Sequence, residues 1–310
     1  MKQWCIGALM LLTLMSVEAR AKQDAVPAGH LSVVTAVFPA YDFVREIAGS
    51  DVSVSILLPP GMESHSFEPT PQDIVRIQNS ALFICVGGES ESWVERVLSS
   101  MDTSRMRIVR MIDCVQALEE EVVEGMQVEE EEEELAYDEH VWTSPRNAVR
   151  IVEQITAALV ALDTQNAAAY QQRTAAYLAE LETLDAVFRN AAASGTRKTI
   201  VFGDRFPFRY LAEEYGLSYF AAFPGCSTET EASAATVAFL IRKIREEHIP
   251  VIFHIELSNE RMADMISEET GAAKRLLHAC HNISKRDFDQ GRTYLDIMNQ
   301  NVINLREALR

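Results

Sequence analysis

The sequence LSVVTAVF, residues 31–38, is the first of four short apolar runs rich in valine and isoleucine. The other runs cover residues 52–58, 81–86 and 107–112. Helix-like segments separate them, at residues 41–47, 71–78 and 92–99. Short apolar runs that alternate with helical segments predict a parallel sheet whose strands are joined by crossover helices.

The second half of the chain repeats this alternation. Its candidate strands are residues 199–202, 218–223, 251–255 and 275–279. Its candidate helices are residues 206–215, 230–247, 259–270 and 293–309. The length of 310 residues also suits two domains of ordinary size. The sequence therefore predicts an α/β protein of two domains, each with a parallel sheet of about four strands.

A long helical stretch lies between the two halves. Ser144 can cap its first part and Pro145 suits the first helical turn. Residues 163–166 read as a break, after which a second helix of about 27 residues, about 40 Å long, ends near Gly195. We expect this helix to be a stiff rod that ties the domains together. The expected segments are a signal peptide (1–21), an N-terminal domain (22–162) with an acidic loop (119–139), the linking helix (163–195) and a C-terminal domain (196–310).

The first residues have the pattern of a secretory signal peptide. Lys2 precedes an apolar run at residues 5–15, and Ala19-Arg20-Ala21 matches a cleavage site. The run is shorter than the roughly 20 residues that span a bilayer. After export, Cys85, Cys114, Cys226 and Cys280 would lie in a compartment that permits disulfide bonds. Four cysteines allow three pairings. We favour Cys226–Cys280, because both residues lie in loops.

Charge narrows the range of partners. The net charge is −18 and no basic patch is present, which argues against nucleic acid or an anionic membrane and favours cations. The glutamate run at residues 129–134, with further glutamates just before it, predicts a solvated, mobile loop. This loop is either an acidic insert without a ligand role or a weak collector of cations.

Four side chains suggest a metal site. His65 lies in GMESHSFEPTP, residues 61–71, and His140 lies in DEHVWTSP, residues 138–145. Asp204 and His281 follow strands of the second half. The carboxyl ends of parallel strands meet at one edge of a sheet, so two facing domains would bring all four residues to one cleft. Three imidazoles with one carboxylate favour zinc, although affinity order alone favours copper.

These motifs also resemble a known family. His65 with FEPTPQD (residues 67–73) resembles the first metal-ligand motif of the ZnuA/TroA-type proteins, the substrate-binding subunits of zinc and manganese ABC importers. HVWTSP (140–145) looks like the second motif, and YLDIM (294–298) is similar to the last helix. The resemblance implies a periplasmic protein that holds zinc, or alternatively manganese, between two domains and delivers it to a membrane permease. We expect a monomer.

The chain departs from the family pattern at two positions. The third ligand of the family is a histidine or glutamate, and the resemblance places it at Gly203, which has no side chain to offer. Asp204 is the nearest substitute. Arg205 could instead form a salt bridge with Asp204. The fourth, commonly an aspartate, falls at His281. Zinc importers of this type often carry a histidine-rich loop where this chain has glutamates. Glu256 is a candidate either for orienting a ligating histidine or for domain packing.

Two other functions are alternatives to metal transport. A secreted zinc hydrolase needs an open coordination position and a base, and the sequence has no His-Glu-x-x-His helix, Gly-x-Ser-x-Gly turn or glycine-rich phosphate loop. We therefore expect no enzyme. An acidic surface adhesin is the other alternative, but no exposed apolar patch is evident in the sequence.

Overall fold

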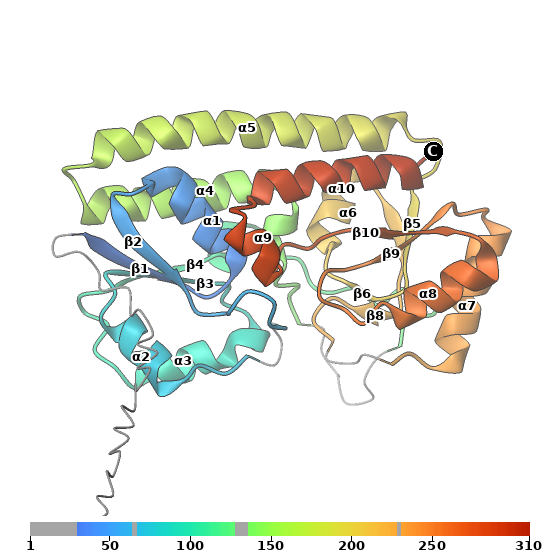
Figure 1. Ribbon diagram of the computed structural model, residues 1–310, viewed down its shortest axis with the longest axis horizontal. Helices are drawn as coiled ribbons and strands as arrows, with labels where there is room; N and C mark the ends of the chain where they lie inside the picture. Colours follow the sequence, from blue (N-terminus) through green and yellow to red (C-terminus); the bar gives the residue numbers. More distant parts are fainter. Residues whose placement is uncertain (1–29, 64–66, 128–135, 228–230) are drawn as a thin grey trace, which may run out of the picture.

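The structure is a computed structural model that describes residues 30–63, 67–127, 136–227 and 231–310. The expected signal peptide, His65 and the glutamate run at 129–134 lie outside the described residues. The described chain forms two α/β lobes, each built on a four-stranded parallel sheet (Figure 1). The predicted fold class is confirmed.

The N-terminal sheet has the strand order β2-β1-β3-β4. Its strands are β1 (Leu31–Thr35), β2 (Val52–Ile56), β3 (Leu82–Cys85) and β4 (Arg107–Arg110). Its helices are α1 (Phe38–Ala48), α2 (Pro71–Gln78) and α3 (Ser92–Ser99). The first predicted strand was too long, because α1 already begins at Phe38 with a proline in its first turn.

The C-terminal sheet has the order β10-β9-β5-β7. Its strands are β5 (Thr199–Phe202), β7 (Ser218–Phe220), β9 (Val251–His254) and β10 (Ala273–Leu276). Its helices are α6 (Arg209–Tyr215), α7 (Ala234–Glu246) and α8 (Arg261–Thr270), whereas the short α9 (Lys285–Asp289) lies beside α1, with the Phe288 and Tyr41 ring centroids 5.3 Å apart. A small second sheet pairs β6 (Arg205–Phe206) with β8 (Phe223–Pro224), and the sequence did not predict it.

Long helices lie side by side along one side of the two lobes (Figure 1). Helix α4 (Pro145–Leu162) begins after Ser144, whose hydroxyl accepts the Asn147 N–H at 3.4 Å. After the predicted break, α5 (Ala167–Ser194) runs for 28 residues, about 42 Å at 1.5 Å per residue. It packs on α4 and α1 of the N-terminal lobe and on α6 and α10 (Tyr294–Ala308) of the C-terminal side (Figure 1). In the described part of the chain, no helix combines the length and apolar character needed to cross a membrane.

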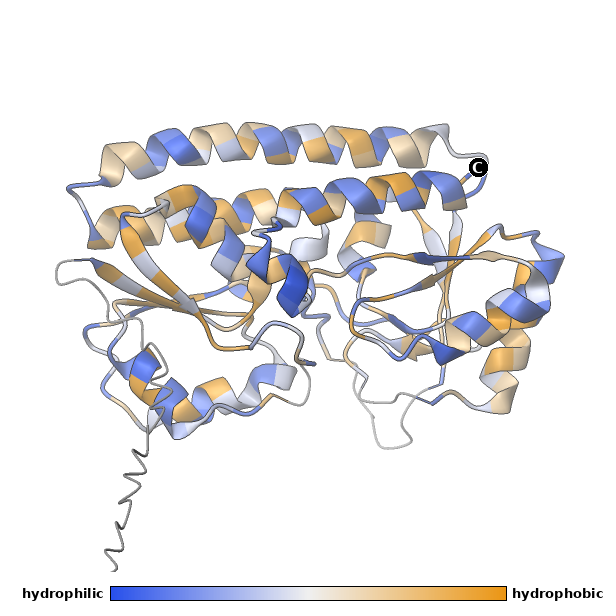
Figure 2. Ribbon diagram, viewed as in Figure 1, coloured by the Kyte–Doolittle hydropathy of each residue, from blue (hydrophilic) through white to orange (hydrophobic). Residues whose placement is uncertain are grey.

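The hydropathy of the residues helps to explain how the strands and α5 pack. Figure 2 shows hydrophobic residues along the N-terminal strands, whereas hydrophobic and hydrophilic residues alternate along α5. The buried side of α5 carries large side chains, including Tyr170, Leu181 and Phe188. The helix is therefore stabilised mainly by packing these buried side chains against both lobes.

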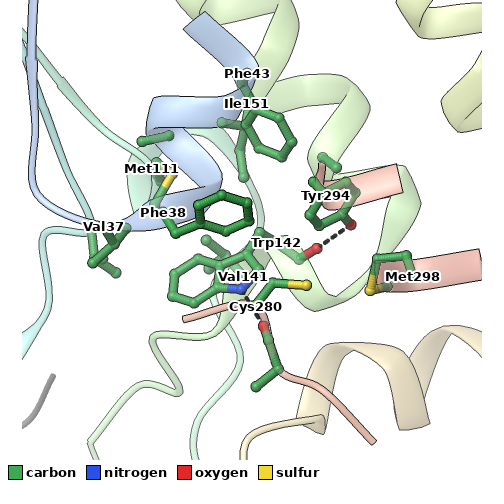
Figure 3. Close-up of a cluster of buried hydrophobic side chains, with 14 of the residues drawn as sticks. Val37, Phe38, Phe43, Met111, Val141, Trp142, Ile151, Cys280, Tyr294 and Met298 are labelled. Atoms are coloured by element: carbon green, nitrogen blue, oxygen red, sulfur yellow. Dashed lines mark hydrogen bonds between the residues drawn. The ribbon is translucent and has the colours of Figure 1, made fainter. Parts of the chain in front are cut away.

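One part of the hydrophobic core surrounds Trp142 and includes side chains from both halves of the chain (Figure 3). The Trp142 side chain is fully buried, and its Nε1–H donates to the Ala279 carbonyl at 2.6 Å. The Tyr294 hydroxyl donates to the Trp142 carbonyl, also at 2.6 Å. Phe43 packs edge-on against Tyr294 with ring centroids 5.0 Å apart. These contacts connect α1, α10 and the loop after β10 into one core.

The predicted Cys226–Cys280 disulfide is wrong. The four described cysteines, at 85, 114, 226 and 280, are all free thiols. Cys280 is buried in the core near Trp142 (Figure 3), and its Sγ lies 3.8 Å from the His278 carbonyl. Cys226 lies among acidic groups, where its N–H donates to Glu120 at 2.7 Å. Burial raises the pKa of both thiols well above the usual value.

Residues 118–127 form a strap that leaves the N-terminal lobe and packs on the C-terminal lobe. Leu118 N–H donates to the Tyr210 hydroxyl at 3.1 Å, and Gln127 N–H donates to the Ala222 carbonyl at 2.9 Å. Glu124 forms an ion pair with Lys243 at 3.5 Å. Residues 119, 121, 122 and 124 are exposed, as expected of a solvated loop, but the segment is held against the C-terminal lobe by these contacts.

A buried carboxyl group predicts how stability depends on pH. Asp42 is fully buried and accepts the Tyr294 N–H at 2.7 Å, and burial raises its pKa to about 7. The folded state therefore holds a proton that the unfolded chain, with an ordinary pKa of about 4, releases. This group makes the free energy of unfolding fall as pH rises from about 4 to about 7.

Asp42→Asn keeps an acceptor for Tyr294 but cannot titrate. At each pH, the free energy of unfolding of the wild type is subtracted from that of the variant. We expect this difference to be about 2–4 kcal/mol larger at pH 8 than at pH 4. Urea unfolding at both pH values measures this difference. Asp289→Asn, at an exposed carboxylate, is the control. Parallel pH profiles for wild type and Asp42→Asn would contradict the assignment.

Candidate metal site

A small cavity of about 30 Å³ lies between the lobes. Its lining residues are Met62, Glu63, His140, Arg205, Pro207, Gly225, Ile255, Glu256, Leu257, Ala279, His281 and Asn282. This volume suits an ion or one or two water molecules, whereas pockets for organic ligands are about ten times larger. The cavity has the size of a site for a single ion.

His140 enters the cavity from the N-terminal lobe. It precedes a short 3-10 helix, Val141–Thr143, and is 1% exposed. Asp138 Oδ1 accepts the His140 main-chain N–H at 2.7 Å and lies 3.2 Å from Nδ1. Burial lowers the pKa of His140, but the charge and hydrogen bond of Asp138 outweigh burial and raise it. A carboxylate at Nδ1 fixes the ring and directs Nε2 toward a ligand, as at many metal sites.

His281 enters from the loop after β10. Its ring centroid lies 5.2 Å from that of His140, at an interplanar angle of 84°. Glu256 holds this loop, because its carboxylate accepts the main-chain N–H groups of Ala279 at 2.7 Å and His281 at 3.0 Å. The structure therefore brings together two of the predicted histidines, from sequence positions 141 residues apart. Glu256 positions His281 through the main chain.

Asn282 joins this loop to the other lobe. Its side-chain amide donates to the carbonyls of Pro59 and Met62, each at 2.8 Å. Gly61 N–H also donates to the Ile283 carbonyl at 2.7 Å. The turn that leads toward residue 65 is thus bound to the loop that carries His281.

Asp204 does not line this cavity. Its Oδ1 accepts the Arg205 N–H at 2.9 Å, and its Oδ2 accepts the Ile255 N–H at 3.3 Å. Burial raises the pKa of this carboxyl. At the neighbouring Gly203, an added Cβ would lie 2.8 Å from the Ala263 Cα. Helix α8 therefore leaves no room for a side chain at the position that the resemblance assigns to a third ligand.

The sequence did not indicate that Glu63 and Asn282 lie at the cavity, and Arg205 was expected as a salt-bridge partner of Asp204. The Arg205 guanidinium instead lines the cavity, and its Nη1 lies 3.3 Å from Glu63 Oε1. Glu63 precedes the candidate ligand His65 by two positions, which is a signal that the sequence contained. Within residues 30–63, 67–127, 136–227 and 231–310, no three His, Cys, Asp or Glu side chains form a group that could hold a metal.

Comparison with known proteins gives extensive matches. Residues 33–308 match the family described as "ZnuA: Zinc-uptake complex component A periplasmic". The chain is 34% identical over 316 residues to the "High-affinity zinc uptake system protein ZnuA" of Bacillus subtilis (strain 168), covering 99% of this chain and 98% of that protein. It is 27% identical to the "Zinc-binding lipoprotein AdcA" of Streptococcus pneumoniae (strain ATCC BAA-255 / R6), covering 98% of this chain and 60% of that protein.

Solved structures share the fold. The metal-dependent lipoprotein YcdH from Bacillus subtilis superimposes with a TM-score of 0.77 at 32% identity, covering 90% of this chain and 100% of that one. The Zn(II)-bound ZnuA-like domain of Streptococcus pneumoniae AdcA gives a TM-score of 0.74 at 27% identity, covering 91% of this chain and 99% of that one.

The family match confirms the predicted resemblance. It also confirms that the chain is a binding component of a transport system and not an enzyme. The match includes both lobes and the helices between them, from β1 to the end of α10. The chain therefore belongs to the ZnuA family of periplasmic zinc-uptake components.

Proposed function

We propose that this protein binds a single zinc ion outside the cytoplasm and delivers it to the permease of an ABC-type importer. The observation that carries the proposal is the pair of imidazoles, His140 and His281, whose ring centroids lie 5.2 Å apart at a cavity of ionic size. Imidazole nitrogen is a preferred ligand of zinc. A relative that is 27% identical carries zinc in a domain of the same fold.

The proposed ligands are His65, His140 and His281. In the sequence, His65 comes two residues after Glu63, which lines the cavity, and the Met62 carbonyl before Glu63 accepts a hydrogen bond from Asn282. Asp204 is the fourth candidate from the sequence. Both of its carboxylate oxygens accept main-chain hydrogen bonds, which favours a role in holding the loop before Arg205.

Zinc titration of the chelator-stripped protein tests the proposal. We expect about one tight site per chain, and we expect its loss in the His65→Ala/His140→Ala double variant. Asp204→Asn should weaken binding much less than either histidine change if Asp204 only holds its loop. Unchanged zinc affinity in the double variant would remove the proposed site.

Manganese is the second candidate ligand, because Glu63 and Glu256 add carboxylate oxygens to the lining of the cavity. Manganese prefers such oxygen ligands, whereas imidazole favours zinc. A competition titration with both ions decides between them. We further propose that the protein acts as a monomer and that its N-terminal segment, residues 1–21, directs export and is removed.

A further inference from the structure

The two carboxylates at the cavity are held in different ways. Glu256 is bound by main-chain N–H groups of the His281 loop, at 2.7 and 3.0 Å. Its side chain is 8% exposed, and the His278 ring nitrogen lies 3.5 Å away. Glu63 lies at the edge of the cavity, is 38% exposed, and pairs across the lobes with Arg205 at 3.3 Å. Glu63 is therefore the carboxylate that is easier to redirect toward an ion.

We propose that Arg205 is a specificity-determining residue that keeps the Glu63 carboxylate from coordinating the bound ion. The inference rests on the proposed metal-binding function. With Glu63 paired to a guanidinium, the cavity offers mainly imidazole nitrogen to a cation. Nitrogen ligands favour zinc, and carboxylate oxygen favours manganese. Arg205 thus biases the site toward zinc.

The surroundings of Arg205 support a fixed guanidinium at this place. Its side chain is 11% exposed, and its Nη1 also donates to the Ser227 carbonyl at 3.2 Å. Its main-chain N–H is bound by Asp204 at 2.9 Å. An arginine stays charged throughout the physiological pH range, so the pair with Glu63 does not depend on protonation of the cation.

Because the cavity is small, the Arg205 guanidinium and the bound ion would compete for the same Glu63 carboxylate. A space of about 30 Å³ holds one ion with little else, so a carboxylate that lines it needs only a small movement to reach that ion. A carboxylate cannot give the same oxygen lone pairs fully to a guanidinium and to a metal. Removal of the guanidinium should therefore release Glu63 to become a ligand.

The test compares zinc and manganese affinities of chelator-stripped Arg205→Gln and wild-type protein by competition titration. We expect the ratio of zinc to manganese affinity to fall by about 10- to 100-fold, the order of magnitude by which groups just outside the ligands change metal affinity. Arg146→Gln makes the same charge change at an exposed surface pair with Glu214 and should leave the ratio unchanged.

A second change isolates Glu63. In the Arg205→Gln/Glu63→Gln double variant the ratio should return close to that of the wild type, because no carboxylate is then released. Arg205→Met, which keeps an unbranched stem without a charge, repeats the measurement if the glutamine variant melts at a much lower temperature. Arg205→Lys keeps the charge beside Glu63 and should stay close to the wild-type ratio.

Two results would overturn the inference. One is a ratio of zinc to manganese affinity that is unchanged in both Arg205→Gln and Arg205→Met. The other is a loss of zinc affinity in Glu63→Gln alone as large as that in a histidine variant, because Glu63 would then already be a ligand. Tight zinc binding with an unchanged ratio removes only this inference, whereas a wild-type protein that binds no zinc removes the proposed function as well.

Discussion

Replacing His281 by asparagine is expected to weaken zinc binding by well over 100-fold. Loss of an outer partner of a metal ligand already costs about 10- to 100-fold in affinity, and loss of a ligand should cost more. His281 is the part of the proposed site that belongs to the loop after β10, and its ring lies beside that of His140. Without it, the ion would be held from one lobe only.

A matched control is His248→Asn. His248 is an exposed histidine with φ = 52°, a left-handed conformation that asparagine tolerates well. We expect this variant to bind zinc as the wild type does, which shows that the effect is specific to the cavity. Isothermal titration of both variants measures the difference. Equal affinities for the His281 and His248 variants would refute a site shared by the two lobes.

Replacing Trp142 by alanine is expected to lower the free energy of unfolding by about 3–5 kcal/mol, the usual cost of removing a large buried aromatic side chain. The Trp142 side chain is fully buried near Phe38 of α1 (Figure 3), and its ring centroid lies 5.1 Å from that of His281. Denaturant unfolding of the metal-free protein measures the loss.

Trp142→Phe separates packing from hydrogen bonding. Phenylalanine fills much of the space, but the Ala279 carbonyl loses the N–H donor that lies 2.6 Å away in the wild type. An unsatisfied buried acceptor costs about 1–3 kcal/mol. Because Ala279 is two residues from His281, we also expect Trp142→Phe to weaken zinc binding. Wild-type stability in the phenylalanine variant would show that this hydrogen bond contributes little.

Local sequence patterns predicted most of the elements. The apolar runs became β1 to β4, and the break at residues 163–166 separates α4 from α5 as expected. These features depend on hydrophobic periodicity and on capping, which act over a few residues. The rule that parallel strands present ligands at their carboxyl ends also explains why His140 and His281 meet.

Other features depend on contacts that no local pattern encodes. Asp204 and Arg205 are adjacent, yet Asp204 binds main-chain N–H groups while Arg205 reaches the cavity. The expected disulfide fails because Cys226 and Cys280 face different surroundings. The strap was expected in solvent, but groups of the C-terminal lobe bind it.

The sequence by itself determined the two α/β lobes, the long helix between them and the candidate histidines, because side-chain periodicity and turn chemistry are properties of neighbouring residues. Only the tertiary structure decided which charged groups meet at the cavity. Glu63 and Arg205 are separated by 142 residues, and their pairing depends on how the two lobes pack together.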